Sequence, residues 1–489
     1  MTAATWDDRT PSRRCDWIDQ LRGWAVIVMI EVHAVNAWLR PGLRPDWLNY
    51  LNGLVAPSFL MAAGFSLVVS TFRTDGTLRP FWPDTARRLG FILLCAYALH
   101  APGFPLADWT VLGTVQKSRE LFKIDILQCI VFSLLVLQAL ARLVKSPKVF
   151  TGLALALALY IPLVSPALWA AGVANGLWLP IRGLFNGNVD RGVQALFPLF
   201  PWLAFPAFGA FLGGLYRELR VASAEGTSRW SEWQFLALLG LMGAALLAWG
   251  GGAKHAWLWG GTWVQHGSVW LLHGHHGTWT WNELQAISNA TLPSVAERLG
   301  WILLGGTAMG AFDLVRPRWR GPNPVEAASR ESLLLYMLHL NLIFGVLLAA
   351  PVVAVTGWGP GSLGWTGTLS LAGALIALNL AVGIGWQKVR TTPALMRNLQ
   401  RKALAVLALW FVVGGWWTLR YFLRSPELAR EPYAFLNAAR ARKGLPPTPD
   451  GLCRDPKEYF TEAQRIGLHL TPQARAQAEA LILARGASR

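Results

Sequence analysis

Charged side chains are scarce in this 489-residue chain, where they make up only 15% of the residues. Soluble domains usually carry about 25%, so the composition argues against an ordinary soluble enzyme. Cysteine is rarer still. The four cysteines show no paired spacing, which argues against a disulfide framework or a zinc site built on cysteine. A cleavable signal peptide is not expected, because the first apolar run is too long and lacks a small-residue cleavage site.

Hydrophobic residues, by contrast, make up 53% of the chain, and they recur in runs of about 20, the length that crosses a bilayer as a helix. The pattern predicts an all-α fold, a polytopic transmembrane helix bundle with about ten or eleven spans. We expect a cytoplasmic N-terminal segment at 1–16, a transmembrane domain at 17–423 and a polar, helical tail at 424–489. The expected spans lie near 17–38, 50–72, 89–105, 124–141, 149–168, 197–216, 232–250, 299–315, 331–350, 366–387 and 403–423.

The formal net charge of +17 would suggest a nucleic-acid partner in a soluble protein. Here the Lys and Arg residues concentrate in the connections on one side of the expected membrane. This asymmetry follows the positive-inside rule and places the N-terminus in the cytoplasm. We therefore expect a multi-pass protein of the cytoplasmic (inner) membrane that contacts anionic lipid and binds no nucleic acid.

Strongly polar side chains interrupt the first expected span, WIDQLRGWAVIVMIEVHAVNAW at 17–38. At 100° per residue, Arg22 and His33 differ by about 20° around the helix axis and are separated by roughly 16 Å along it. Asp19 and Asn36 fall within about 60° of His33 on the same face. Because ionisable groups are costly in hydrocarbon, such a face usually lines a bundle interior or a watery cavity.

His33 lies about 18 Å from Leu21, the expected inner boundary of the hydrocarbon. A neutral imidazole at this depth can take a proton from an attacking amine or hydroxyl, or can itself act as the nucleophile. The structural alternative is a hydrogen bond that serves packing alone. Arg22 can hold a phosphate or carboxylate in a bidentate manner, or it can be a topology charge paired with Asp19.

Two further segments carry candidate residues. Ser332, Tyr336 and His339 recur on one face of the span 331–350 and can line the same cavity, or they can hydrogen-bond between helices. Asp125 begins the span 124–141 on the outer side. It can orient an imidazole, as a carboxylate does in a catalytic triad, or it can serve the helix N-terminus.

The outer segment 251–298 is rich in Trp and His and contains the run HGHH. Its spacing matches no zinc signature, so we expect no metal site. Its Trp side chains suit an aromatic belt at the membrane interface or stacking on sugar rings.

Several motifs in this order resemble one family of membrane-bound acyltransferases. They are RRCDWIDQLRGWAVIVMIEVHA, APSFLMAAGFSL at 56–67, KIDILQCI at 123–130, FPLFPWLAFPAFGAFLGG at 197–214 and SLLLYMLH at 332–339. Together they resemble the bacterial relatives of heparan-alpha-glucosaminide N-acetyltransferase, within the transmembrane acyltransferase clan. The resemblance covers roughly residues 13–350.

The resemblance implies transfer of an acyl group, chiefly acetyl, from a cytoplasmic acyl-CoA to an amine or hydroxyl of a carbohydrate or glycolipid outside. Acetyl-CoA is then a co-substrate, with no permanently bound cofactor. We assign His33 and Asp125 to catalysis, and donor or substrate contacts to Asp19, Arg22, Asn36, Ser332, Tyr336 and His339. The loop 39–53 has no His where the heparan enzymes place one, and position 33 holds the His of the related O-acyltransferase branch.

Four alternatives stay open. The choice between N- and O-acylation is not fixed by the sequence, nor is the choice between direct transfer and an acyl-histidine route. The chain can act alone or as a homodimer. A transporter or flippase without acyl-transfer chemistry would also need buried polar residues along its path, although no inverted repeat is visible.

Overall fold

The computed structural model of this chain describes residues 16–100, 121–170, 177–185, 195–224, 231–259, 289–315, 323–344 and 361–399, and parts of 401–487. These residues are organised in helices, with isolated bridges in place of strands. The chain divides into two compact units. The first comprises 1–99 with 122–391, and the second comprises 100–121 with 392–489.

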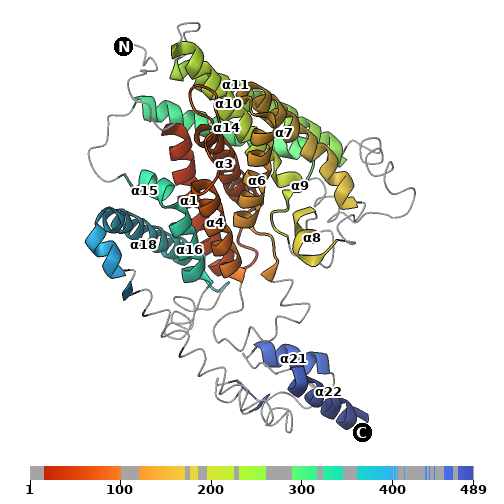
Figure 1. Ribbon diagram of the computed structural model, residues 1–489. Helices are drawn as coiled ribbons and strands as arrows, with labels where there is room; N and C mark the ends of the chain where they lie inside the picture. Colours follow the sequence, from red (N-terminus) through yellow and green to blue (C-terminus); the bar gives the residue numbers. More distant parts are fainter. Residues whose placement is uncertain are drawn as a thin grey trace. The chain divides into compact units, whose positions relative to one another are not determined.

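The first unit is a bundle of helices of very different lengths (Figure 1). They are α1 (Asp16–Trp38), α2 (Asp46–Asn52), α3 (Val55–Thr71), α4 (Asp84–His100), α6 (Ile126–Val144), α7 (Pro147–Ala170), α8 (Leu179–Phe185), α9 (Leu199–Trp202), α10 (Ala204–Ala224), α11 (Glu232–Trp259), α14 (Leu292–Val315), α15 (Pro324–Arg330), α16 (Ser332–Ile343) and α18 (Trp365–Thr391).

The prediction of an all-α membrane bundle is confirmed. Among the described residues, six helical stretches are long and apolar enough to cross a bilayer. They are Asp46–Thr71, Ile126–Val144, Pro147–Trp169, Leu199–Ser223, Glu232–Lys254 and Trp365–Thr391. The chain is therefore a multi-pass membrane protein.

The helices follow the expected spans closely, with informative differences. The expected span 50–72 consists of α2 and α3, which meet at Gly53 and Leu54; glycine is a poor helix former. α16 ends at Ile343, and residues 345–350 lie outside the described part, as does most of the expected span 403–423. The predicted boundary at 423/424 also falls outside it.

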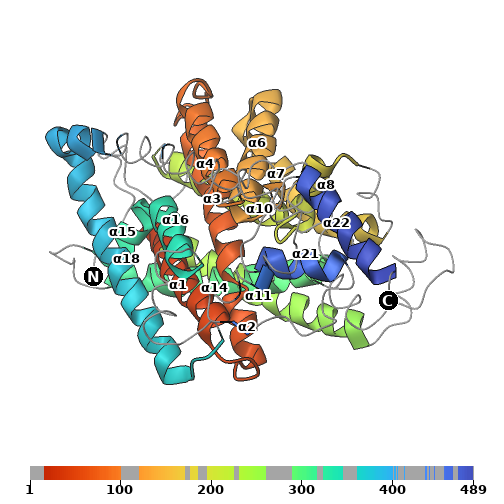
Figure 2. The same cartoon turned by 90° about the horizontal axis from the view of Figure 1, so that it is seen from below.

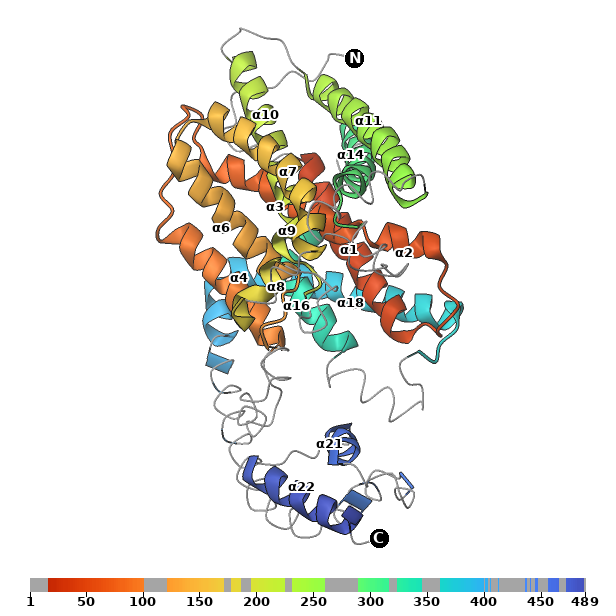
Figure 3. The same cartoon turned by 90° about the vertical axis from the view of Figure 1, so that its right-hand side faces the viewer.

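Small residues allow α3 and α10 to lie side by side at very short range (Figure 3). A Cβ atom added at Gly64 would overlap the carbonyl oxygen of Pro206, and one added at Gly209 would overlap that of Met61. Backbones can approach this closely only where side chains are small, which is the usual basis of helix packing in membranes. α11 and α14 pack together in the same manner through Gly243, Gly250 and Gly300.

The core of the bundle surrounds α1. Val26, Ile30 and Ala34 on this helix are completely buried. α1 contacts α3, α14, α15, α16 and α18, and α18 runs alongside α1, α15 and α16 (Figure 2). The first helix is thus held from several sides, which fixes the direction of its polar face.

Two isolated backbone pairings fix the ends of helices near that face. Ile124, just before α6, pairs with Ala195, and its carbonyl accepts hydrogen bonds from the amides of Leu196 and Phe197. Leu39, just after α1, pairs with Leu363. The first pairing holds residue 125 at the start of α6.

The second unit contains α21 (Pro456–Arg465) and α22 (Pro472–Ala487), and these two helices pack against each other. The side chain of Tyr459 on α21 is fully buried. Glu462 pairs with both Arg440 and Arg465. Both helices fall within the segment 424–489, where the sequence predicts a polar, helical tail.

Candidate functional site: an elongated intramembrane cavity

A cavity of about 590 Å³ lies inside the first unit. Its walls come from α1, α2, α3, α4, α6 and α16, and from Leu196 and Phe197 in the segment before α9. Side chains from six different helices thus meet around one cavity, which is the usual form of a small-molecule site.

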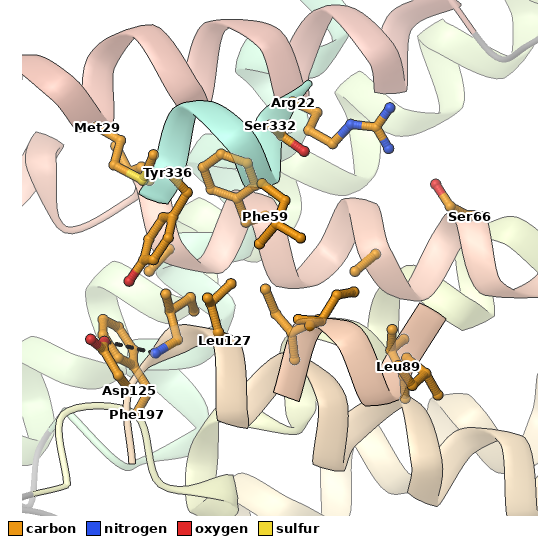
Figure 4. A pocket seen from close by; sticks show the side chains of 18 of the residues that line it. Arg22, Met29, Phe59, Ser66, Leu89, Asp125, Leu127, Phe197, Ser332 and Tyr336 are labelled. Carbon is orange, nitrogen blue, oxygen red and sulfur yellow. Dashed lines mark hydrogen bonds between the residues drawn. The ribbon is translucent and has the colours of Figure 1, made fainter. Parts of the chain in front are cut away.

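The cavity is elongated, polar at both ends and apolar between them (Figure 4). Arg22 and Ser66 lie at one end, and Asp125 and Tyr336 lie at the other. Phe59 and Leu127 lie between the two ends. The apolar lining of the cavity also includes Met29, Ala63, Ile130 and Leu333.

α1 lines this cavity along much of its length. Arg22, Met29, His33 and Asn36 all border it, at spacings of seven, four and three residues. Such spacings place side chains on one face of a helix. The polar face expected from the sequence therefore does point into a cavity.

At the Arg22 end, the guanidinium bridges α1 to α15. Its Nε donates to the carbonyl oxygen of Ser329 at 3.1 Å and to Ser329 Oγ at 3.0 Å. Nη2 donates to Asp19 Oδ1 at 2.8 Å. Asp19 does not itself border the cavity, so its visible role is to hold Arg22.

Sequence reasoning missed several polar residues at this end. Ser66 and Ser70 from α3, and Asp84, Thr85 and Arg88 from α4, also border the cavity. Charges close to an expected membrane boundary are typical topology signals. Only the packing of α4 against the other helices brings its charged side chains to the cavity. With Arg22 and Arg88, this end offers two cations and several hydroxyl groups to an anionic ligand.

At the opposite end, Asp125 caps α6. Its carboxylate accepts from the amide of Ile126 at 2.7 Å, and Gln128 completes a capping box. Tyr336 on α16 borders the same end of the cavity. The helix cap expected for Asp125 is therefore present, and its role in orienting an imidazole stays a prediction.

His33 lines the cavity at the same end, and Asp125 is close enough to act on it electrostatically. Its ring lies against that of His339, with centroids 5.2 Å apart and planes inclined by 34°. His339 itself is fully buried and does not border the cavity. The contact of His339 with substrate that the sequence predicts stays a prediction, and the structure places this side chain behind His33.

Asparagine side chains complete this end. Asn36 borders the cavity and accepts a hydrogen bond from Arg44. Asn52 at the end of α2 also borders it, and its buried Nδ2 has no hydrogen-bond partner among the described residues. Asn52 was not singled out from the sequence, because it belongs to an apolar run whose break after α2 is not obvious.

Ser332 joins Tyr336 in the wall formed by α16. The structure thus brings Arg22, His33, Asn36, Asp125, Ser332 and Tyr336 to one cavity, with Asp19 and His339 directly behind it. In the described residues no group of three His, Cys, Asp or Glu side chains could hold a metal ion. The HGHH run lies outside the described residues.

These features define a class: a multi-pass helical membrane protein with a cavity between its helices and ionisable groups at both ends of that cavity. The model of one protein family, described as "Heparan-alpha-glucosaminide N-acetyltransferase, catalytic", matches residues 14–249. The match confirms the resemblance expected from the sequence over just under half of the chain. It supports a membrane acetyltransferase of a family that uses acetyl-CoA. A comparison with curated proteins finds no match.

Proposed function

We propose that this protein transfers an acyl group, in the first instance acetyl, from cytoplasmic acyl-CoA to an amine or hydroxyl of an extracytoplasmic glycan or glycolipid. The observation that carries the proposal is the single cavity that joins Arg22 to His33, two residues roughly 16 Å apart along α1. A charged donor and a polar acceptor can meet there without moving the nucleotide through hydrocarbon.

The apolar middle of the cavity suits a flexible pantetheine arm better than a nucleotide. The phosphates of the donor would stay at the end that carries Arg22 and Arg88, where guanidinium groups can bind them in a bidentate manner. The thioester would then reach the end that carries His33. The proposal has the N-terminus and Arg22 on the cytoplasmic side of the inner membrane, and the charge asymmetry of the chain supports this orientation.

In the direct route, His33 takes the proton from the acceptor as its oxygen or nitrogen attacks the thioester carbonyl. The carbon–sulfur bond then breaks, and the proton passes from His33 to the departing CoA thiolate. In the two-step route, a ring nitrogen of His33 attacks the thioester carbonyl, the carbon–sulfur bond breaks, and CoA leaves as the thiol with the ring proton of the acylated imidazole. The acceptor then attacks the acyl carbon, the carbon–nitrogen bond to the imidazole breaks, and the imidazole takes up the acceptor's proton. Either route needs an imidazole whose reacting nitrogen carries a lone pair and faces the cavity.

The test uses the purified full chain in lipid nanodiscs with acetyl-CoA labelled in the acetyl group and a mixture of cell-envelope glycans. We expect label on the glycan fraction, and we expect His33→Ala to lower its rate of appearance by at least about 10²-fold. His100→Ala provides the control for loss of a histidine, because His100 does not border the cavity. Full activity in a normally folded His33→Ala protein would contradict the assignment of His33.

One further observation favours a second candidate. A cavity with polar groups at both ends also suits a transporter or flippase, since ionisable groups line substrate paths in such proteins. The same nanodisc assay separates the two, because a transporter would not move label from CoA to glycan. Uptake of glycan into proteoliposomes without transfer of label would favour this second candidate.

A further inference from the structure

The ring of His33 packs against the ring of another histidine. His33 from α1 and His339 from α16 lie with ring centroids 5.2 Å apart. The edge of Phe344 packs on His33 at 5.8 Å, and Tyr336 packs on His339 at 5.6 Å. Aromatic side chains thus confine both imidazoles, and His339 lies on the protein side of the pair.

His339 is fully buried, and its hydrogen bonding defines its tautomer. Nδ1 lies 2.7 Å from the carbonyl oxygen of Leu335, one helical turn earlier. A carbonyl oxygen can only accept, so Nδ1 carries the hydrogen. In a neutral imidazole the other nitrogen, Nε2, is then an acceptor.

This acceptor lacks a hydrogen-bond donor within the described part of the chain. His339 Nε2 is buried and has no hydrogen-bond partner among the described residues. Buried polar atoms in folded proteins are nearly always hydrogen-bonded, and an exception at a reactive site calls for a role. The imidazole of His33 is adjacent and can offer an N–H.

Asp125, the other candidate for orienting His33, caps α6. Its carboxylate accepts a hydrogen bond from the amide of Ile126. It acts on His33 through its charge. His339 lies against the His33 ring and offers it a buried acceptor.

We propose that His339 is a positioning residue for His33, a role that rests on the proposed acyl transfer. Rotation of the His33 ring brings one N–H onto Nε2 of His339, and the other nitrogen then presents its lone pair to the cavity. Which ring nitrogen of a histidine reacts is set by the hydrogen bond that the other one makes. Such contacts are often long without substrate and tighten when it binds.

The proton balance follows from this geometry. The acceptor's proton goes to the cavity-facing nitrogen of His33 and leaves on the CoA thiolate, while a bond forms from the acceptor to the acyl carbon. His339 keeps its own Nδ1 hydrogen on Leu335 throughout and is not consumed. It takes the orienting role that a carboxylate has in a catalytic triad.

Two substitutions separate the two nitrogens of His339. In His339→Asn, the side-chain amide can still donate to Leu335 but offers no acceptor at the Nε2 position. In His339→Gln, the longer side chain places an acceptor at the Nε2 position. Both are polar and both remove the ring, so a role in packing alone predicts similar losses.

The kinetic arm measures kcat and KM for acetyl-CoA in nanodiscs. We expect His339→Asn to lower kcat about 10²-fold with the donor KM within about twofold, and His339→Gln to retain at least tenfold more kcat than His339→Asn. Equal kcat values in the two variants, or a change confined to KM, would overturn the proposal. Thermal unfolding of both variants confirms that they fold.

The second arm does not depend on transferase activity. Solid-state NMR of the full chain with ¹⁵N-labelled histidine, in bilayers, reads the tautomer of each ring, and the His33 signals are assigned by their loss in His33→Gln. We expect one His33 tautomer in the unsubstituted protein and a mixture in His339→Asn. A mixture already present in the unsubstituted protein would overturn the role of His339. If the tautomer behaves as expected but no acyl transfer is found, the proposed function fails and the positioning contact stands.

Discussion

Arg22 and His33 lie on one face of α1 and border the same cavity at its two ends. Along the helix axis, roughly 16 Å therefore separate a cation that can hold an anionic group from an imidazole that can perform chemistry. This relationship explains why the first helix carries so many polar side chains. It also determines what each substitution along the cavity should change.

Arg22→Lys should weaken binding of the donor more than it slows the reaction. Lysine keeps the charge but cannot make the planar, two-pronged contact of a guanidinium, and it cannot reproduce the bridge to Ser329. We expect KM for acetyl-CoA to rise about tenfold, equivalent to about 1.4 kcal/mol, with kcat within about threefold. A fall in kcat at unchanged KM would place Arg22 at the reacting group instead.

Asp125→Asn should keep the helix cap and remove the negative charge. Asparagine caps helices about as well as aspartate, so the thermal midpoint should change little, whereas the electrostatic effect on His33 disappears. We expect kcat to fall about tenfold, a loss of about 1.4 kcal/mol of transition-state stabilisation. Asp125→Ala should in addition cost about 1 kcal/mol of stability. An unchanged kcat in Asp125→Asn would show that Asp125 serves only as a helix cap.

Gly64→Ala should destabilise the bundle, because the added Cβ overlaps the carbonyl oxygen of Pro206. Overpacking of this kind costs about 1–3 kcal/mol, and a rigid backbone neighbour gives little relief. Gly90→Ala on α4 is the matched control, since a Cβ there meets nothing within 4 Å. Thermal unfolding in nanodiscs should rank Gly64→Ala well below the unsubstituted chain and Gly90→Ala at or above it. Equal midpoints would show that α3 and α10 are not packed as described.

The second unit should lose stability in acid. The hydrogen bond from Arg465, with help from its charge and from Arg440, lowers the pKa of Glu462 below its ordinary value. Because the folded-state pKa is the lower one, the stabilisation is present above the unfolded pKa of about 4.3 and is lost as the pH falls through the folded pKa.

Hydrogen exchange in α21 of the full chain checks this expectation. Amide protection should fall between pH 7 and about pH 3 by more than intrinsic exchange explains, and Glu462→Gln should lower protection at pH 7 and flatten the dependence. Protection that depends on pH equally in both proteins would assign the effect to other groups.

The sequence predicted the fold and the direction of the polar face because both follow from local patterns. Apolar runs define the helices, and the spacing of Arg22, His33 and Asn36 places them on one side of α1 whatever surrounds it. The contribution of Arg88 could not be predicted, because it depends on how α4 lies against the other helices. The place of His339 behind His33 is likewise a result of packing between α1 and α16.

The measurement that tests the account most directly is the sidedness of transfer. The full chain is reconstituted in one orientation in sealed proteoliposomes, with labelled acetyl-CoA on the side of Arg22 and the glycan acceptor confined to the side of His33. The account predicts that label crosses to the acceptor although CoA stays where it was added. Label that appears only when donor and acceptor share one compartment would contradict a cavity that joins the two faces.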